Sequence, residues 1–263
     1  MHFDAFDRYH DTTSFIHRLD PRVKVLVTIA FILSNALLPD GAWLAFALAW
    51  SFLLIANVLS NLGIIFTLKR SFVALPFALV AITVLFSIPG KPLTTFHFMM
   101  WDFTITDMGL LRFESILVRS WLSVQMAILL VATARFPDLI HAFEHLRVPS
   151  ILTTIIAFLY RYLFVLADEV FRLLRARESR SAAAAGARSG GGVAWRARVA
   201  GNMAGQLFLR SYERSDRVYN AMLARGYTGH LNTMNPHELH RVDYISLAGA
   251  LVIILLLQVV GRL

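Results

Sequence analysis

The sequence predicts an all-α, polytopic membrane protein with about five transmembrane helices and a cytoplasmic amphipathic region between the fourth and the last. Of its 263 residues, 57% are hydrophobic and only 16% are charged, whereas a soluble domain has about 45–50% and about 25%. The charge is also segregated, because 15 of the 25 Lys and Arg residues are arginines between Arg135 and Arg241. Lys and Arg concentrate on the cytoplasmic side of a membrane, which indicates one basic cytoplasmic region.

Five segments have the length and composition of transmembrane helices, because a hydrocarbon core about 30 Å thick requires roughly 20 apolar residues. They are residues 23–38, 42–59, 72–89, 110–134 and 244–260. The first follows Asp20 and Pro21, which favour a helix start as N-cap and first helical residue. The third contains Pro76, which transmembrane helices tolerate.

The apolar segment 151–167 differs from these five. Arg161 interrupts it, and an arginine-rich stretch follows it directly. If the segment crossed the membrane, that stretch would lie opposite the basic residues Lys69, Arg70 and Arg135, so we expect it to lie along the cytoplasmic interface. With a cytoplasmic N-terminus, this topology places 21 of the 25 Lys and Arg residues inside the cell.

The chain is therefore expected to divide into three parts. These are N-terminal transmembrane helices at 1–134, a cytoplasmic region at 135–241 and a C-terminal transmembrane helix at 242–263. Acidic, histidine and arginine residues precede the first apolar run, so the N-terminus is not a cleavable signal.

Three amphipathic helices are expected in the cytoplasmic region. A short one begins at Phe136, a long one continues from the apolar segment through Arg180, and a third spans about 203–225. The run Ser-Gly-Gly-Gly at 189–192 breaks the second helix, and Gly226 is a natural C-cap for the third. These helices cannot fold as an independent soluble core, so they need the membrane or a partner.

One histidine motif fits a metal-dependent enzyme. His141, Glu144 and His145 match the H-x-x-E-H string of some zinc peptidases. This alternative, a membrane-embedded metallopeptidase, requires a third protein ligand on a supporting domain, whereas a solvated helix face requires nothing further. The absence of cysteine excludes thiol catalysis, and no phosphate-binding P-loop occurs. We therefore expect no catalytic residue, no resident metal and no cofactor in this chain.

The fourth predicted transmembrane helix contains three ionisable residues, Arg112, Glu114 and Arg119, and the last two lie furthest inside it. Ionisable residues within the bilayer mark a functional or pairing site by default. The alternative interpretation is that both lie near the outer interface and extend their side chains to water.

Two short motifs have the same arrangement of residues. Ser179-Arg180-Ser181 and Ala224-Arg225-Gly226 each place one arginine between small residues at the predicted end of an amphipathic helix. A guanidinium group can project from such an end and form paired hydrogen bonds with a carboxylate or with carbonyl groups of another protein. The alternative is a pair of solvated arginines that the helix dipole favours.

Four stretches of the chain resemble a known family. They are HRLDPRVK at 17–24, LRVPS at 146–150, YRYLFVLADE at 160–169 and LFLRSYERSDRVYNAMLARGY at 207–227. The chain is similar over almost its whole length to the T component of energy-coupling factor (ECF) transporters, in the cobalt/nickel branch typified by the permease CbiQ.

The resemblance implies two coupling motifs with a central arginine. The second corresponds to Ala224-Arg225-Gly226 and the first to Ser179-Arg180-Ser181, which has serine where the family usually has alanine. Ala187-Arg188-Ser189 matches the family's usual residues better but lies beyond the expected end of the helix. Both positions therefore stay open for the first motif.

The resemblance also implies a function without catalysis in this chain. A T component links a dimer of ABC-type ATPases to a substrate-binding membrane S component, in contact with membrane lipid and in the bacterial inner membrane. The cargo of this branch is cobalt or nickel. We expect no nucleic-acid partner, since acidic lipid headgroups or an acidic protein surface can balance arginines beside a membrane.

Overall fold

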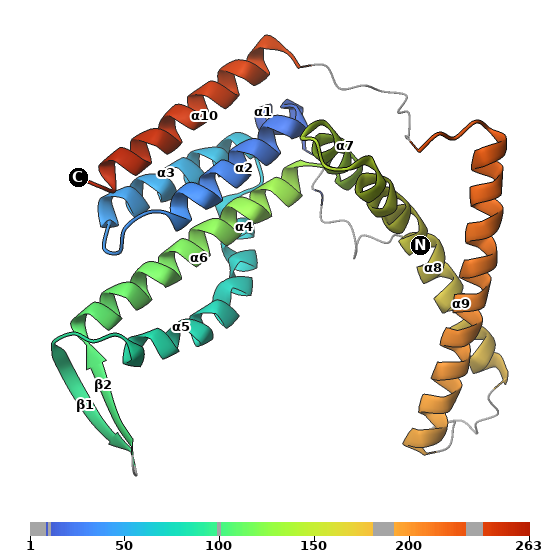
Figure 1. The fold of residues 1–263 in the computed structure, drawn as a ribbon, viewed down its shortest axis with the longest axis horizontal. Helices are drawn as coiled ribbons and strands as arrows, with labels where there is room; N and C mark the ends of the chain where they lie inside the picture. Colours follow the sequence, from blue (N-terminus) through green and yellow to red (C-terminus); the bar gives the residue numbers. More distant parts are fainter. Residues whose placement is uncertain (1–8, 10–11, 99–100, 181–191, 230–238) are drawn as a thin grey trace. The chain divides into compact units, whose positions relative to one another are not determined.

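The computed structural model describes residues 9, 12–98, 101–180, 192–229 and 239–263, and these are almost entirely helical (Figure 1). The chain divides into two compact units, a helical bundle within residues 2–146 and 236–263, and a helix pair within residues 147–235. The predicted all-α class is confirmed.

The bundle is built around long apolar helices. Its described helices are α1 (Phe15–Arg18), α2 (Pro21–Ala36), α3 (Trp43–Ser60), α4 (Ile64–Ser71), α5 (Leu75–Ser87), α6 (Asp107–Thr133), α7 (Phe136–His145) and α10 (Arg241–Val260). The core lies between α2, α3, α6 and α10, where Phe31, Leu53, Leu122 and Ile254 are buried together. Burial of these side chains holds the four helices side by side.

Helices α2 and α6 run antiparallel. Near the start of α2, Nζ of Lys24 donates to the carbonyl of Thr133 at the end of α6 (3.0 Å). Near the end of α2, Nδ2 of Asn35 donates to the carbonyl of Arg119, in the middle of α6 (2.9 Å). These bonds fix how the two helices lie along one another.

Helices α2 and α10 run parallel. At their N-terminal ends the backbone N–H of Asp20 donates to Oδ1 of Asp243 (2.9 Å), and near their C-terminal ends Nε2 of Gln258 donates to the carbonyl of Ser34. Asp20 is also the N-cap that the sequence predicts, because its Oδ1 accepts from the backbone N–H of Arg22 (2.8 Å). The N-terminal ends of α2 and α10 therefore meet the C-terminal end of α6 at one end of the bundle.

The third predicted transmembrane helix, 72–89, largely matches α5 (Leu75–Ser87), which begins after a 3-10 turn (Phe72–Ala74). The sequence did not predict the bend at its start, where the parts Ile64–Ala74 and Leu79–Ser87 are bent by 59° relative to each other. Pro76 explains the break, since proline has no backbone N–H and its ring clashes with the carbonyl four residues earlier.

A β-hairpin connects α5 to α6, and the sequence interpretation missed it. Strand β1 (Pro92–Phe98) pairs antiparallel with β2 (Trp101–Thr106), with Thr95 opposite Thr104 and His97 opposite Asp102. The available signal was the concentration of threonine and aromatic residues, which are enriched in strands.

The second unit consists of two long helices, α8 (Ser150–Arg180) and α9 (Val193–Ala224). Helix α8 confirms the predicted helix that continues through Arg180. Helix α9 begins at Val193 rather than near 203, so the predicted start is wrong. Residues 193–203 are rich in alanine and arginine, which are strong helix formers and outweigh the single Gly201.

Four described helices are long and apolar enough to cross a membrane: α3, α6, α8 and α10. The bent pair of α4 and α5 raises this number to as many as five. Helix α2 has 16 residues, slightly fewer than the roughly 17–25 of a typical crossing. These helices agree with a multi-pass membrane protein.

Candidate functional site

Glu169 links helices α8 and α9. Glu169 of α8 accepts a hydrogen bond from Nη1 of Arg210 in α9, and Nη1 of Arg172 lies 3.9 Å from its other carboxylate oxygen. The Glu169 side chain is only 14% exposed, against 56% for Arg210. A covered carboxylate paired with an arginine of the facing helix fixes the point where the two helices meet.

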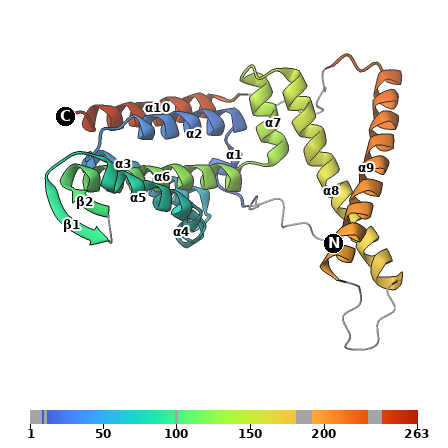
Figure 2. The same cartoon turned by 60° about the horizontal axis from the view of Figure 1, so that its bottom comes forward.

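The two helices run in opposite directions. A hollow of about 500 Å³ lies between the C-terminal part of α8 and the N-terminal part of α9. Leu173 and Arg180 line it from α8, and Trp195 and Met203 line it from α9. The end of α8 therefore lies beside the start of α9, as Figure 2 shows.

The first predicted coupling arginine lies at the end of α8. Arg180 is the last residue of this helix, and both Arg180 and Ser179 are exposed. The hydroxyl of Ser179 donates to the carbonyl of Ala176 (3.0 Å) within the same helix. Ser181 and the alternative coupling arginine Arg188 lie outside the described residues.

The second predicted coupling arginine follows α9 at a well-defined helix end. Arg225 is exposed, and Gly226 has a φ of 81°. The N–H of Gly226 donates to the carbonyl of Leu223 and the N–H of Tyr227 to that of Met222, both at 3.0 Å. This pair of bonds is the Schellman motif, so the predicted C-cap at Gly226 is confirmed.

Ala224, the last residue of α9, and Arg225, which follows it, lie far from Arg180. Trp195 shares the hollow with Arg180 and lies near the start of α9. Since an α-helix rises 1.5 Å per residue, the two arginines lie about 45 Å apart along α9. The structure thus brings the two motifs into one helix pair but at opposite ends of it.

The helix pair has many large apolar side chains exposed. Of the 32 residues of α9 none is buried, and of the 31 of α8 only Thr153 is. Large exposed apolar residues include Ile155, Leu159, Phe208 and Tyr212. Exposed apolar surface on this scale marks contact with protein or lipid, which agrees with the expectation that these helices need the membrane or a partner.

Sequence reasoning did not single out Glu169 or Arg210. Both lie in the stretches that carry the family resemblance, YRYLFVLADE and LFLRSYERSDRVYNAMLARGY. Their 41-residue separation leaves no local pattern that pairs them.

The histidine motif gains no support as a metal site. His141 and Glu144 lie on successive turns of α7, with Nδ1 of the histidine 3.9 Å from the carboxylate. Across the described residues, no group of three or more His, Cys, Asp or Glu side chains is arranged to hold a metal ion. The metallopeptidase alternative therefore lacks its third ligand there.

Arg119 is a pairing residue rather than a freely solvated one. Its Nη2 donates to the carbonyl of Leu38 (2.6 Å) and to Oδ1 of Asp40 (2.8 Å) in the loop between α2 and α3. Glu114 is exposed. Arg119 thus ties α6 to the α2–α3 loop, which gives it a structural role.

The long apolar helices of the bundle define a multi-pass membrane protein, and the helix pair adds exposed apolar side chains and exposed arginines at its ends. A family model described as "Cobalt transport protein", CbiQ, matches residues 12–236. The chain belongs to this family, and it is a T component of the energy-coupling factor type.

Curated relatives agree with this membership. The chain is 28% identical to an uncharacterised protein of Methanocaldococcus jannaschii, over 98% of this chain and 86% of the relative. It is 28% identical to the energy-coupling factor transporter transmembrane protein EcfT of Lacticaseibacillus paracasei, over 94% of each chain. It is 30% identical to the nickel permease LarQ of Lactiplantibacillus plantarum, over 46% of this chain and 41% of the relative.

Proposed function

We propose that this T component couples a dimer of ABC-type ATPases to a substrate-binding membrane S component in an importer of cobalt or nickel ions. The family description names cobalt, and a relative is named a nickel permease. ATP is hydrolysed in the ATPases and the ion is recognised in the S component, so this chain transmits force and catalyses nothing.

The observation that carries the proposal is the pair of exposed arginines at opposite ends of the α8–α9 pair. Arg180 and Arg225 lie about 45 Å apart along α9, and both are exposed. One guanidinium group therefore serves each ATPase of a dimer, in a groove where carboxylate or carbonyl groups accept its hydrogen bonds.

The contact between α8 and α9 converts ATPase closure into movement of the helix pair. When ATP brings the two ATPases together, the helix ends that hold Arg180 and Arg225 are displaced toward each other. The helices turn about the Glu169–Arg210 contact, an ion pair that links them. Their exposed apolar faces then shift the S component and release the ion inward.

The bundle itself supports a topology in which α8 does not cross the membrane. The end of α6 and the start of α10 lie at the same end of the bundle, joined through α2 by Lys24 and Asp20. The chain between Thr133 and Arg241 must therefore cross an even number of times. Among the described helices there, only α8 is apolar and long enough to cross, so zero crossings is the consistent number.

This topology supports the expected three-part division at 1–134, 135–241 and 242–263. With 135–241 on the cytoplasmic side, the N-terminus that leads into α2 is cytoplasmic as well, because α2 begins at the same end of the bundle. The proposed location is the bacterial inner membrane, with membrane lipid around α3, α5, α6 and α10.

The proposal is tested by charge reversal in the assembled transporter. We expect Arg180→Glu and Arg225→Glu each to abolish ATP-driven uptake of labelled cobalt and nickel and to weaken co-purification of the ATPases. The matched control is Arg262→Glu. It reverses an exposed arginine after the C-terminal end of α10, at the end of the bundle away from Asp20 and Lys24. Full uptake by both coupling variants would overturn the proposal.

A further inference from the structure

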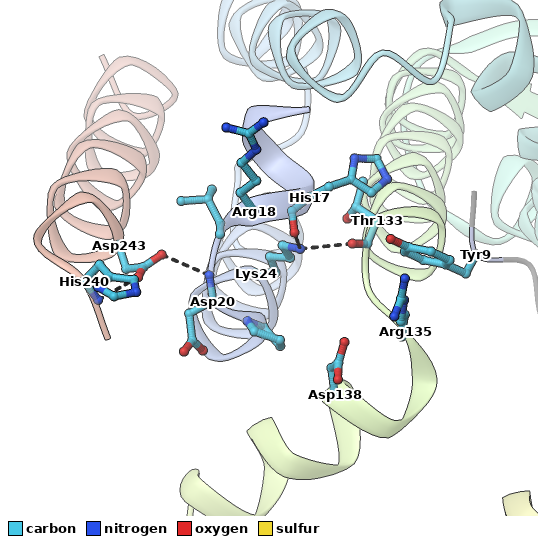
Figure 3. A pocket seen from close by; sticks show the side chains of 12 residues that line it. Tyr9, His17, Arg18, Asp20, Lys24, Thr133, Arg135, Asp138, His240 and Asp243 are labelled. Carbon is cyan, nitrogen blue, oxygen red and sulfur yellow. Dashed lines mark hydrogen bonds between the residues drawn. The ribbon is translucent and has the colours of Figure 1, made fainter. Parts of the chain in front are cut away.

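The helix ends that meet at one end of the bundle line an open polar cavity of about 290 Å³ (Figure 3). Its lining includes three basic and three acidic side chains: Arg18, Lys24, Arg135, Asp20, Asp138 and Asp243. The formal charges of these six residues cancel. Because electrostatic complementarity selects ligands, the cavity suits a ligand that carries both charges better than it suits a simple anion or cation.

An apolar cavity of about 280 Å³ adjoins the polar one. The two share Leu19, Lys24 and Thr133 in their walls. The rest of the second lining is mostly aliphatic and includes Val27 and Leu129. A polar cavity beside an apolar one fits an amphiphilic molecule, with its charged group in the first and its hydrocarbon in the second.

Lys24 lies at the boundary between the two cavities. It is 8% exposed, and its Nζ donates to the carbonyls of His17 and Thr133, both at 3.0 Å. An ammonium group has three N–H donors. Beyond these two bonds, one N–H is left for an acceptor such as a phosphate oxygen.

Asp20 has an acceptor that lacks a donor, whereas Lys24 has a donor that lacks an acceptor. Its side chain is 3% exposed, and Oδ1 accepts from the backbone N–H of Arg22. Its other oxygen, Oδ2, is buried and has no hydrogen-bond partner in the described part of the chain. A buried carboxylate oxygen without a donor is unfavourable, so a ligand N–H at this position would stabilise the site.

We propose that the two adjacent cavities open to each other around Lys24 and bind one phospholipid whose headgroup carries a primary ammonium, as in phosphatidylethanolamine. An acyl chain occupies the apolar cavity, the phosphodiester accepts from Nζ of Lys24, and the ammonium donates to Oδ2 of Asp20. The helix ends place the polar cavity where headgroups lie, and the apolar cavity extends along α2, α3, α6 and α10 into the hydrocarbon region.

Headgroup chemistry makes this site selective. The quaternary ammonium of phosphatidylcholine has the charge but no N–H for Asp20. Phosphatidylglycerol has the phosphodiester but no ammonium. With matched acyl chains, we therefore expect phosphatidylethanolamine to bind about tenfold more tightly than either, the difference that one charge-assisted hydrogen bond commonly makes.

The test is native mass spectrometry of the full chain in detergent, titrated separately with the three lipids. Asp20→Asn keeps a good helix N-cap but removes the negative charge, so it should reduce binding of phosphatidylethanolamine to the level of phosphatidylcholine. Glu114→Gln is the control, because Glu114 is an exposed carboxylate in α6 and does not line either cavity.

Two results would overturn the proposal. One is equal binding of the three lipids to the unmodified chain, and the other is an unchanged preference in Asp20→Asn. Free phosphoethanolamine, which lacks acyl chains, distinguishes a lipid from a soluble ligand with the same headgroup. Binding of the free compound as tight as that of the lipid would also reject the role of the apolar cavity.

Discussion

Asp243 is expected to be the main polar anchor of α10 in the bundle. It is 4% exposed, and it accepts from two backbone N–H groups, those of Asp20 and His240, both at 2.9 Å. Asp243→Ala leaves both donors without this acceptor. Hydrogen bonds to charged groups contribute about 1.5–3 kcal/mol each, and because one of the two is only partly buried, we expect a total loss of about 3 kcal/mol.

The loss is measured as a shift in thermal unfolding of the purified chain in detergent, followed by tryptophan fluorescence. For a chain of this size, about 2–4 °C per kcal/mol corresponds to a decrease in Tm of roughly 6–12 °C. Asp243→Asn keeps one side-chain oxygen as an acceptor, so its Tm should lie between those of the unmodified chain and Asp243→Ala.

Glu114→Ala is the matched control, since Glu114 is an exposed carboxylate in α6. Its Tm should stay within about 1 °C of the unmodified chain, as is usual for surface substitutions. A Tm for Asp243→Ala equal to that of the control would refute the anchoring role.

Three further predictions concern the end of α9, the contact between α8 and α9, and the histidine motif of α7. Gly226→Ala forces a side chain into a φ of 81° and should cost about 1 kcal/mol, misdirect Arg225 and reduce uptake several-fold. Gly201→Ala, which has equally open surroundings but lies in α9, should leave uptake unchanged. Glu169→Gln removes the charge opposite Arg210 and should broaden the distance distribution between spin labels on α8 and α9; an unchanged distribution would show that the pair is held otherwise. His145→Ala should leave both uptake and the metal content of the purified chain unchanged, whereas loss of stoichiometric zinc would favour the metallopeptidase alternative.

Features that depend on neighbouring residues were predictable from the sequence. Asp20 before Pro21 correctly predicted the start of α2, and Gly226 correctly predicted the end of α9. The bend before Pro76 was missed because transmembrane helices often tolerate proline, and only tertiary packing decides whether the helix continues. Neighbouring residues thus predicted the start of α2 and the end of α9, but they did not predict the bend near Pro76.

Contacts between distant residues were not predictable from one sequence. Asp20 and Asp243 are separated by 223 positions, and Glu169 and Arg210 by 41, so no periodic pattern connects them. The predicted coupling arginines were found from their motifs and the resemblance. That they occupy opposite ends of one antiparallel pair required the structure, because the direction of α9 relative to α8 depends on packing.

The coupling role of Arg180 and Arg225 is tested most directly by site-specific cross-linking in the assembled transporter. The chain has no cysteine, so Arg180→Cys and Arg225→Cys each introduce a single reactive position. With a short bifunctional thiol reagent and single cysteines in the ATPase groove, we predict that each variant forms a cross-link to an ATPase subunit. Absence of ATPase cross-links from both positions, while a cysteine elsewhere on α9 forms them, would contradict the account.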